Sequence, residues 1–323
     1  MKSKMSAVLW AAVIGILLPG LMFAVADKFL AGRDLSEREQ NTGQTLPLAG
    51  TAEQPLVLQN GSLTQMDMDA YIAGVLLAEM PASFHQEALK AQAVVARTYA
   101  LKTNTTGTKH PNRAVCTESA CCQGYNTVDE YLARGGTEEG VAKICSAVAA
   151  TTGQVLTYQG ALIDATYFSC SGGRTEDALA VWGTDVPYLQ SVDSPGEEKA
   201  THYADVLQFT SAEFAECLGI EPSGKPSSWL GAVTYTQGGG VDTIEICGDI
   251  YRGTQLRSLL GLRSTAFAML IVGETVYIST RGFGHRVGMS QYGADAMAVG
   301  GSDYCEILSH YYTGAVVSAY PAN

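Results

Sequence analysis

The segment Tyr71-Ile-Ala-Gly-Val-Leu-Leu-Ala-Glu79-Met-Pro81 carries a single acidic residue in an apolar stretch that a proline closes. Its spacing predicts a helix, because apolar residues and the acid recur at i, i+3, i+4 and i+7, namely Ile72, Val75, Leu76 and Glu79. The carboxylate therefore shares the face that a helix turns toward a core. Burial disfavours the ionised form and raises the pKa, so Glu79 is a candidate general acid. The alternative is a structural Glu79 paired with a Lys or Arg.

The segment that follows supplies candidate partners for this acid. Ser83-Phe-His-Gln86 has the pattern of a capping box, and residues 87–101 form a predicted alanine-rich helix. Lys90 and Arg97 lie along one edge of that helix. They could hold an anionic or polar substrate beside Glu79 or tune its protonation. The alternative is an ordinary solvent-exposed helix face.

The N-terminal segment is predicted to cross a membrane. Lys2 and Lys4 precede residues 7–26, which carry no charge and are long enough to span a bilayer as a helix. The two lysines predict a cytoplasmic N-terminus and an exported body. Ala24-Val-Ala26 also resembles a signal-peptidase site, so a cleaved signal peptide is the alternative to an anchor. Residues 27–50 are polar and typical of a tether.

Composition and charge limit the partners of the exported body. The chain has 323 residues, 46% of them hydrophobic, which suffices for a well-buried catalytic region in one large domain or two lobes. Its formal net charge is −12 and no basic run suggests nucleic-acid binding. Phospholipid headgroups and teichoic acid are disfavoured as partners for the same reason. An anionic substrate must therefore be held locally, by groups such as Lys90 and Arg97.

Three residues among the His and Cys side chains have a spacing that suits a metal. His110, Cys116 and Cys122 form the pattern H-x5-C-x5-C in a stretch with Gly and Pro. These ligands suit tetrahedral zinc, with a fourth position left for water or a carboxylate. Cys121 is a rival ligand or a spare thiol. Most of the remaining cysteines are expected to be small buried residues; they are Cys145, Cys170, Cys217, Cys247 and Cys305.

The second half of the chain has the alternation and turn signals of β-hairpins. The predicted pairs are residues 155–158 with 161–168, 233–236 with 243–246, and 267–272 with 275–280. Residues 256–262 and 303–312 are predicted short helices.

These elements predict an α+β fold, with an N-terminal membrane helix followed by a mixed helical and antiparallel-β catalytic region. We expect that region to span residues 51–323 and to form two lobes around a cleft. Within it, residues 100–150 are expected to hold a zinc-binding loop, and residues 200–265 a β-rich subdomain.

Two glycine-rich segments, residues 169–176 and 281–293, stand apart from this scaffold. Glycines there permit tight turns and close backbone approach. The side chains that could bind a sugar or a peptide in these segments are Ser171, His285, Ser290 and Gln291. A Ser-His pair with Asp185 would suggest a hydrolase triad, but no G-x-S-x-G elbow is present. Purely structural loops are the other alternative.

Taken together, these segments resemble the stage II sporulation protein D family over residues 56–312. The matching motifs are Tyr71-Ile-x-x-Val-x-x-x-Glu79-Met-Pro, Glu87-Ala-Leu-Lys-Ala-Gln-Ala-x-x-Ala-Arg-Thr-Tyr-Ala100, Ser171-Gly-Gly-x-Thr-Glu176, Val181-Trp-Gly183 and Gly284-His-x-Val-Gly-Met-Ser-Gln-Tyr-Gly-Ala294. The resemblance implies a membrane-anchored peptidoglycan lytic transglycosylase that acts when a mother cell engulfs its forespore. Its location would be the sporulation septum and engulfing membrane.

The resemblance also implies roles for residues and for partners. The family's catalytic Glu falls on Glu79, its two cations on Lys90 and Arg97, and a zinc site of some members on His110, Cys116 and Cys122. The substrate would be glycan strands stripped of stem peptides by the stage II sporulation protein P amidase. Stage II sporulation protein M would be a further partner.

Two positions depart from the family pattern, and two other functions stay open. Arg286 stands where the family usually has glycine, so either the backbone there does not need a positive φ or the loop is altered. Cys170 stands where serine is common. Related proteins are non-catalytic enhancers of an amidase. A zinc hydrolase would instead use metal-bound water with Glu79 as its base, but no H-E-x-x-H signature supports it.

Overall fold

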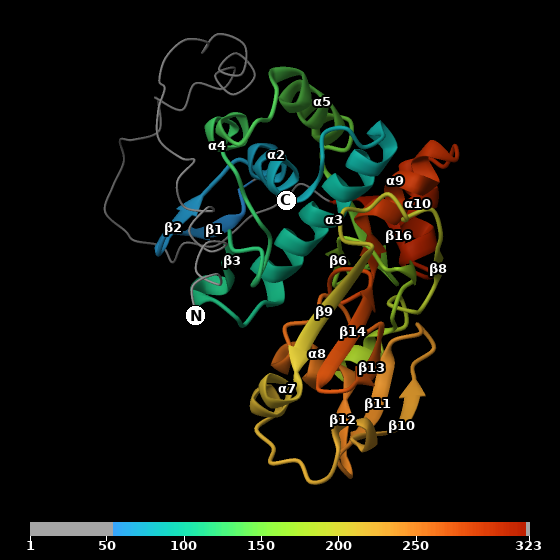
Figure 1. The fold of residues 1–323 in the computed structure, drawn as a ribbon. Helices are drawn as coiled ribbons and strands as arrows, with labels where there is room; N and C mark the ends of the chain where they lie inside the picture. The colour runs from blue at the N-terminus through green and yellow to red at the C-terminus, as the bar shows by residue number, and fades with distance from the viewer. Residues whose placement is uncertain (1–53, 321–323) are drawn as a thin grey trace. The chain divides into compact units, whose positions relative to one another are not determined.

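The computed structural model describes residues 54–320 and has a mixed α+β fold (Figure 1). The predicted anchor at residues 7–26 and tether at residues 27–50 lie outside this range. Among residues 54–320, no helix is both long and apolar enough to cross a bilayer. The predicted division into two lobes and subdomains stays a prediction.

The first half of the described chain is mainly helical. Its elements in order are β1 (Leu56–Gln59), β2 (Ser62–Gln65), α2 (Met68–Glu79), α3 (Gln86–Thr106), the 3-10 helix η2 (Pro111–Arg113), β3 (Val115–Cys116), α4 (Val128–Ala133), α5 (Glu138–Ala149), β4 (Gln154–Tyr158) and β5 (Ala161–Leu162). Helices α2, α3 and α5 pack against one another and enclose the larger group of buried apolar side chains. The predicted helix around Glu79 is confirmed, because Ile72, Val75 and Leu76 are fully buried on α2.

The second half alternates short strands and helices. Its elements are β6 (Tyr167–Phe168), β7 (Gly173–Arg174), α6 (Ala178–Trp182), β8 (Asp193–Ser194), β9 (Ala204–Thr210), α7 (Ser211–Leu218), η3 (Pro226–Ser228), β10 (Leu230–Tyr235), β11 (Val241–Ile246), β12 (Asp249–Arg252), α8 (Gly253–Leu259), β13 (Phe267–Val272), β14 (Thr275–Arg281), β15 (Met289–Ser290), α9 (Gln291–Val299), α10 (Tyr304–Tyr311) and β16 (Val316–Ala319). Two three-stranded sheets, β13-β14-β9 and β10-β11-β12, contribute side chains to a second group of buried apolar residues together with α7 and α8. The hairpins predicted within these two sheets are confirmed.

Two local predictions are wrong. The α3 helix begins after His85, whose side chain accepts from the Glu87 N–H at 3.3 Å, so Ser83 is not the capping residue. The hairpin that starts with β4 ends at Leu162 rather than continuing to Phe168. Tyr167 and Phe168 instead form β6, which pairs in parallel with β15. Apolar alternation alone could not separate these two pairings, because β6 finds its partner more than a hundred residues along the chain.

A buried cation joins the helices to the start of β4. Arg97 of α3 is 1% exposed, and its guanidinium contacts the Asp69 carboxylate of α2 at 2.9 Å. The same group donates to the carbonyls of Thr151 and Gln154 at 2.8 and 3.2 Å. Arg97 therefore links α2, α3 and the segment that leads into β4, and its polar contacts stabilise the fold.

We predict that Arg97→Met lowers the free energy of unfolding by about 2–4 kcal/mol, because it removes the ion pair with Asp69 and two hydrogen bonds to backbone carbonyls from a buried position. Lys90→Met on the same helix is the control, since Lys90 is partly exposed and, within residues 54–320, contacts only the Glu87 carboxylate and the face of the Tyr304 ring. The control should cost less than about 1 kcal/mol. Chemical denaturation at neutral pH measures both, and equal losses would contradict a structural role for Arg97.

Candidate functional site

Glu79 is the last residue of α2 and its carboxyl group is half-buried. Oε1 accepts a 2.6 Å hydrogen bond from the backbone N–H of Gly124. Burial raises the pKa of the Glu79 carboxyl, while the Gly124 N–H and the side chains of Gln291 and Tyr167 partly oppose the shift. The direction agrees with the sequence prediction. An acid held in this way keeps its proton to a higher pH than an exposed glutamate does.

The loop that carries Gly124 lies along the last turns of α2. Asn126 donates from its backbone to the Gly74 carbonyl at 3.0 Å, and from its side chain to the Leu77 carbonyl at 3.2 Å. A β-carbon on residue 124 would stand 2.8 Å from Glu79 Oε1, and one on residue 74 would enter the Tyr125 ring. Glycine at both positions lets the loop approach the helix closely enough for the 2.6 Å contact.

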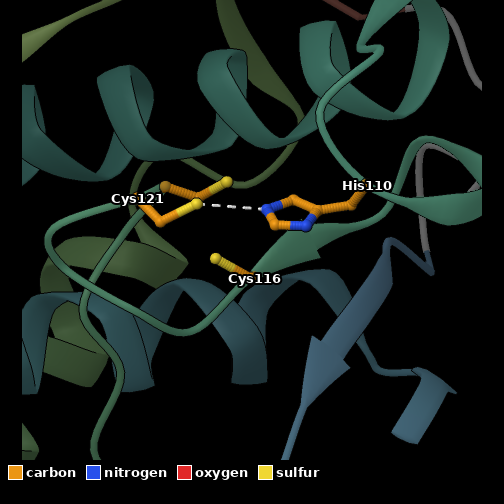
Figure 2. A group of neighbouring side chains, drawn as sticks. His110, Cys116 and Cys121 are labelled. Carbon is orange, nitrogen blue, oxygen red and sulfur yellow. Dashed lines mark hydrogen bonds between the residues drawn. The ribbon is translucent and has the colours of Figure 1, made fainter. Parts of the chain in front are cut away.

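The same loop holds a group of metal-ligating side chains. The ligand atoms of His110, Cys116, Cys121 and Cys122 all lie within 4.8 Å of one another. Figure 2 shows three of them pointing toward a common centre, with His110 Nε2 3.2 Å from Cys121 Sγ. Strand β3 places Cys116, because it pairs in parallel with β1.

This donor set fits a tetrahedral zinc ion. The sequence predicted three ligands and a fourth position for water or a carboxylate. The structure brings Cys121 into the group as a fourth side chain that could ligate a metal. Three thiols and one imidazole are a combination that closed structural zinc sites use, whereas catalytic sites keep one position open for water. The group can therefore fix the loop without supplying an open coordination position.

Gln123 links the metal-ligating group to the acid. It lies between Cys122 and Gly124 in the chain and is fully buried. Its amide donates to the Tyr71 hydroxyl at 3.1 Å and accepts from the Tyr167 hydroxyl at 3.4 Å. Tyr167 therefore contacts Gln123 and also acts on Glu79. Sequence reasoning missed both residues, because Gln123 was treated as part of a loop and Tyr167 as part of a hairpin.

The two predicted cations are engaged elsewhere. Arg97 is occupied by Asp69 and two carbonyls, as described above. Lys90 contacts the Glu87 carboxylate at 2.7 Å and lies over the Tyr304 ring at 5.7 Å. Neither is among the groups that shift the Glu79 pKa, which are the Gly124 N–H, Gln291 and Tyr167.

The two glycine-rich segments meet at a buried carboxylate, Glu197. Its Oε2 accepts from the backbone N–H and the hydroxyl of Ser171, both at 2.8 Å, and from the N–H groups of Gly172 and Gly173. Its Oε1 accepts from the hydroxyls of Ser194 and Ser290. Ser171 and Ser290 are thus fully buried and donate to Glu197. Sequence reasoning missed Glu197, whose local context, Ser194-Pro-Gly-Glu197, signals only a turn.

A buried ion pair also joins the two glycine-rich segments, residues 169–176 and 281–293. Arg286 contacts Glu176 at 3.1 Å, and the two side chains are 2% and 1% exposed. The guanidinium also donates to the carbonyls of Ser171, Arg174 and Gly238. Its φ is +67°. The backbone therefore keeps the left-handed conformation that glycine favours, and the four contacts of the Arg286 side chain offset the strain.

Of the remaining predicted residues, Gln291 acts on the acid, and His285 contacts the backbone of Tyr167. The Gln291 side chain is buried, and its amide lowers the Glu79 pKa, opposing the effect of burial. His285 Nδ1 accepts from the Val287 N–H at 3.1 Å, and its ring also interacts with the Tyr167 backbone. The serines are engaged with Glu197, so the structure gives no support to a Ser-His-Asp185 triad.

Comparison with known proteins shows the family of the chain. The chain is 40% identical over 264 residues to stage II sporulation protein D of Bacillus subtilis (strain 168), covering 80% of this chain and 76% of that protein. It belongs to the stage II sporulation protein D family. The protein of that name from Bacillus amyloliquefaciens is 38% identical over the same shares. The family model, described as stage II sporulation protein, matches residues 59–158, which include Glu79 and the metal-ligating group.

A further family relative has a different description. The amidase enhancer of Bacillus subtilis (strain 168) is 29% identical over 77% of this chain and 40% of its own length. The similarity to the sporulation proteins and to this enhancer supports a sporulation and cell-wall context for the chain.

We predict that Glu79→Gln makes the protein more stable than wild type at neutral pH but not in acid. The Glu79 pKa is raised in the folded state, so the folded protein binds this proton more tightly than the unfolded chain. Stability from this group is therefore present at low pH and lost as pH rises through the raised pKa. Denaturation of both proteins from pH 4 to pH 8 tests this, and parallel curves would contradict it.

Proposed function

We propose that the protein is a peptidoglycan lytic transglycosylase that cleaves the bond between N-acetylmuramic acid and N-acetylglucosamine. The observation that carries this proposal is the single Glu79 carboxyl, half-buried, with a raised pKa and neutral donors around it. Within residues 54–320, the groups that shift its pKa include no second carboxylate. Membership of the stage II sporulation protein D family supports the proposal.

One acid is enough for this reaction. Ordinary glycoside hydrolysis needs two carboxyl groups, one to protonate the leaving oxygen and one to attack the sugar or activate water. In a lytic transglycosylase the substrate supplies the nucleophile. Protonated Glu79 gives its proton to the glycosidic oxygen, and the C1–oxygen bond of the muramic residue breaks. The carboxylate then takes the proton of the muramic C6 hydroxyl as that oxygen bonds to C1. The product carries a 1,6-anhydro end, and Glu79 regains its proton.

The surrounding groups suit both halves of this cycle. Burial favours the protonated acid that begins the reaction. The Gly124 N–H favours the carboxylate that follows proton donation, because it donates to Oε1 at 2.6 Å. Gln291 and Tyr167 act in the same direction.

We further propose that zinc bound by His110, Cys116, Cys121 and Cys122 has a structural role. The metal would hold the loop whose Gly124 N–H contacts the acid. Four protein ligands leave no position for a metal-bound water, so this donor set disfavours the zinc-hydrolase alternative.

The context of the reaction is part of the same proposal. The substrate would be glycan stripped of stem peptides, with stage II sporulation protein P and stage II sporulation protein M as partners. The protein would be held in the cell membrane by residues 7–26, with its body outside the cytoplasm, at the septum and engulfing membrane.

The second candidate function is an enhancer that binds glycan and stimulates an amidase without cutting. The similarity to the Bacillus subtilis amidase enhancer favours it. The two functions differ in what happens at the glycosidic bond, so product analysis separates them.

We predict that the purified protein releases anhydro-muramic ends from peptide-free glycan strands and that Glu79→Gln does not. The variant lacks a transferable proton, so cleavage should fall at least about a hundredfold. Mass spectrometry of the released ends gives the result. Retained turnover by Glu79→Gln would rule out the role of Glu79, reducing ends would show hydrolysis by water, and binding without any cleavage would favour the enhancer.

We predict that Cys116→Ser loses bound zinc and lowers the melting temperature, because metal binding and loop folding are coupled. Cys305→Ser is the matched control, since Cys305 is exposed on α10. Metal content by mass spectrometry and thermal unfolding are read on the same samples. A variant that keeps the wild-type melting temperature would contradict the structural role of the metal.

A further inference from the structure

The exposed indole of Trp182 is a feature that the proposed reaction does not use. Trp182 ends the short helix α6, and Gly183 follows in the left-handed conformation. The side chain is 46% exposed, although tryptophan is usually well buried. Exposed Thr184 and Asp185 come next in the chain. The site therefore has a flat apolar surface with polar groups at its edge.

The ring of Trp182 has a rigid support. Its centroid lies 5.4 Å from that of His285, and the His285 ring lies 5.7 Å from that of Phe168. Phe168 is buried. Burial and the nearby Arg257 lower the pKa of His285 to about 4, so this ring is neutral at pH 7. Its contacts with Val287 and the Tyr167 backbone hold it in place.

The aromatic cluster of Phe168, His285 and Trp182, whose rings meet edge-on or tilted, shares strand β6 with a residue of the acid site. Phe168 directly follows Tyr167, whose side chain acts on Glu79. Both residues belong to β6, which pairs with β15 immediately before Gln291. One two-residue strand therefore carries a residue that acts on the carboxyl and, pointing to the other face, the buried member of the aromatic cluster.

We propose that Trp182 is a stacking platform for a sugar ring of the glycan strand, at a position beside the bond that Glu79 cleaves. This inference rests on the proposed function for its ligand. A pyranose ring presents a flat face of C–H groups to an aromatic ring and directs its hydroxyls outward, toward groups such as Thr184 and Asp185. Ligand sites commonly combine such an aromatic surface with a few polar groups. On this proposal, a glycan strand bound at Glu79 would extend to the exposed face of Trp182.

The experiment measures binding of peptide-free glycan oligosaccharides by calorimetry. The full-length Glu79→Gln protein is the parent, so that binding is read without cleavage. Adding Trp182→Ala should weaken binding of an octasaccharide about tenfold, with a smaller loss for a disaccharide that does not reach the platform. Trp182→Phe keeps a flat ring and should retain most of the affinity, whereas Trp182→Leu keeps apolar bulk and should not. Ile250→Ala, an exposed apolar side chain of β12, should bind like the parent.

The outcomes test the Trp182 proposal separately from the transglycosylase proposal. If Trp182→Ala and Trp182→Leu bind the octasaccharide like the parent, Trp182 does not stack on a sugar ring. This holds even when wild type cleaves glycan. If the parent fails to bind the octasaccharide, the platform is also wrong. If the Trp182 variants lose affinity as expected while wild type never cleaves, the platform stands and the transglycosylase proposal fails. Unchanged melting temperatures of the variants confirm that the losses come from the removed ring.

Discussion

The contact between the Gly124 N–H and the Glu79 carboxyl is the interaction on which the rest of the site depends. An acid at the end of an apolar helix needs a polar partner, because an unpaired buried carboxyl is costly. That partner comes from a loop 45 residues further along the chain. Hydrogen bonds from Asn126 to carbonyls of α2 hold the loop against the helix, and the side chains of His110 and three cysteines gather further back along the same loop. The Asn126 contacts therefore keep the Gly124 N–H next to the carboxyl.

Features that follow from local periodicity could be predicted from the sequence. The helix around Glu79, the helix that carries Arg97, and the hairpins β10–β11 and β13–β14 all lie within short windows whose apolar pattern matches the burial seen in the structure. The raised pKa of Glu79 follows from the same pattern. The metal-ligating group was partly predictable. Spacing pointed to His110, Cys116 and Cys122, but it could not decide whether the fourth position belongs to water, a carboxylate or Cys121.

Features that depend on contacts distant in sequence could not be predicted. Glu197 accepts from Ser171 and Ser290, which lie 26 residues before it and 93 residues after it. Nothing near Glu197 in the chain signals that role. Arg97 has the spacing of a helix-edge cation, yet Asp69 and the Thr151 carbonyl convert it into a buried link. Tyr167 fits a hairpin by alternation, but the parallel pairing with β15 brings it to the acid instead.

The Glu197 carboxylate affects how loss of activity in variants should be interpreted. Substitution of either serine that donates to it removes a partner from a buried charge and loosens both glycine-rich segments at once. A screen for inactive mutants would then recover Ser171 and Ser290 together with Glu79, although the serine hydroxyls face the protein interior. Their phenotype would be one of folding and abundance rather than of chemistry. Protein levels measured beside activity would sort the two kinds of position.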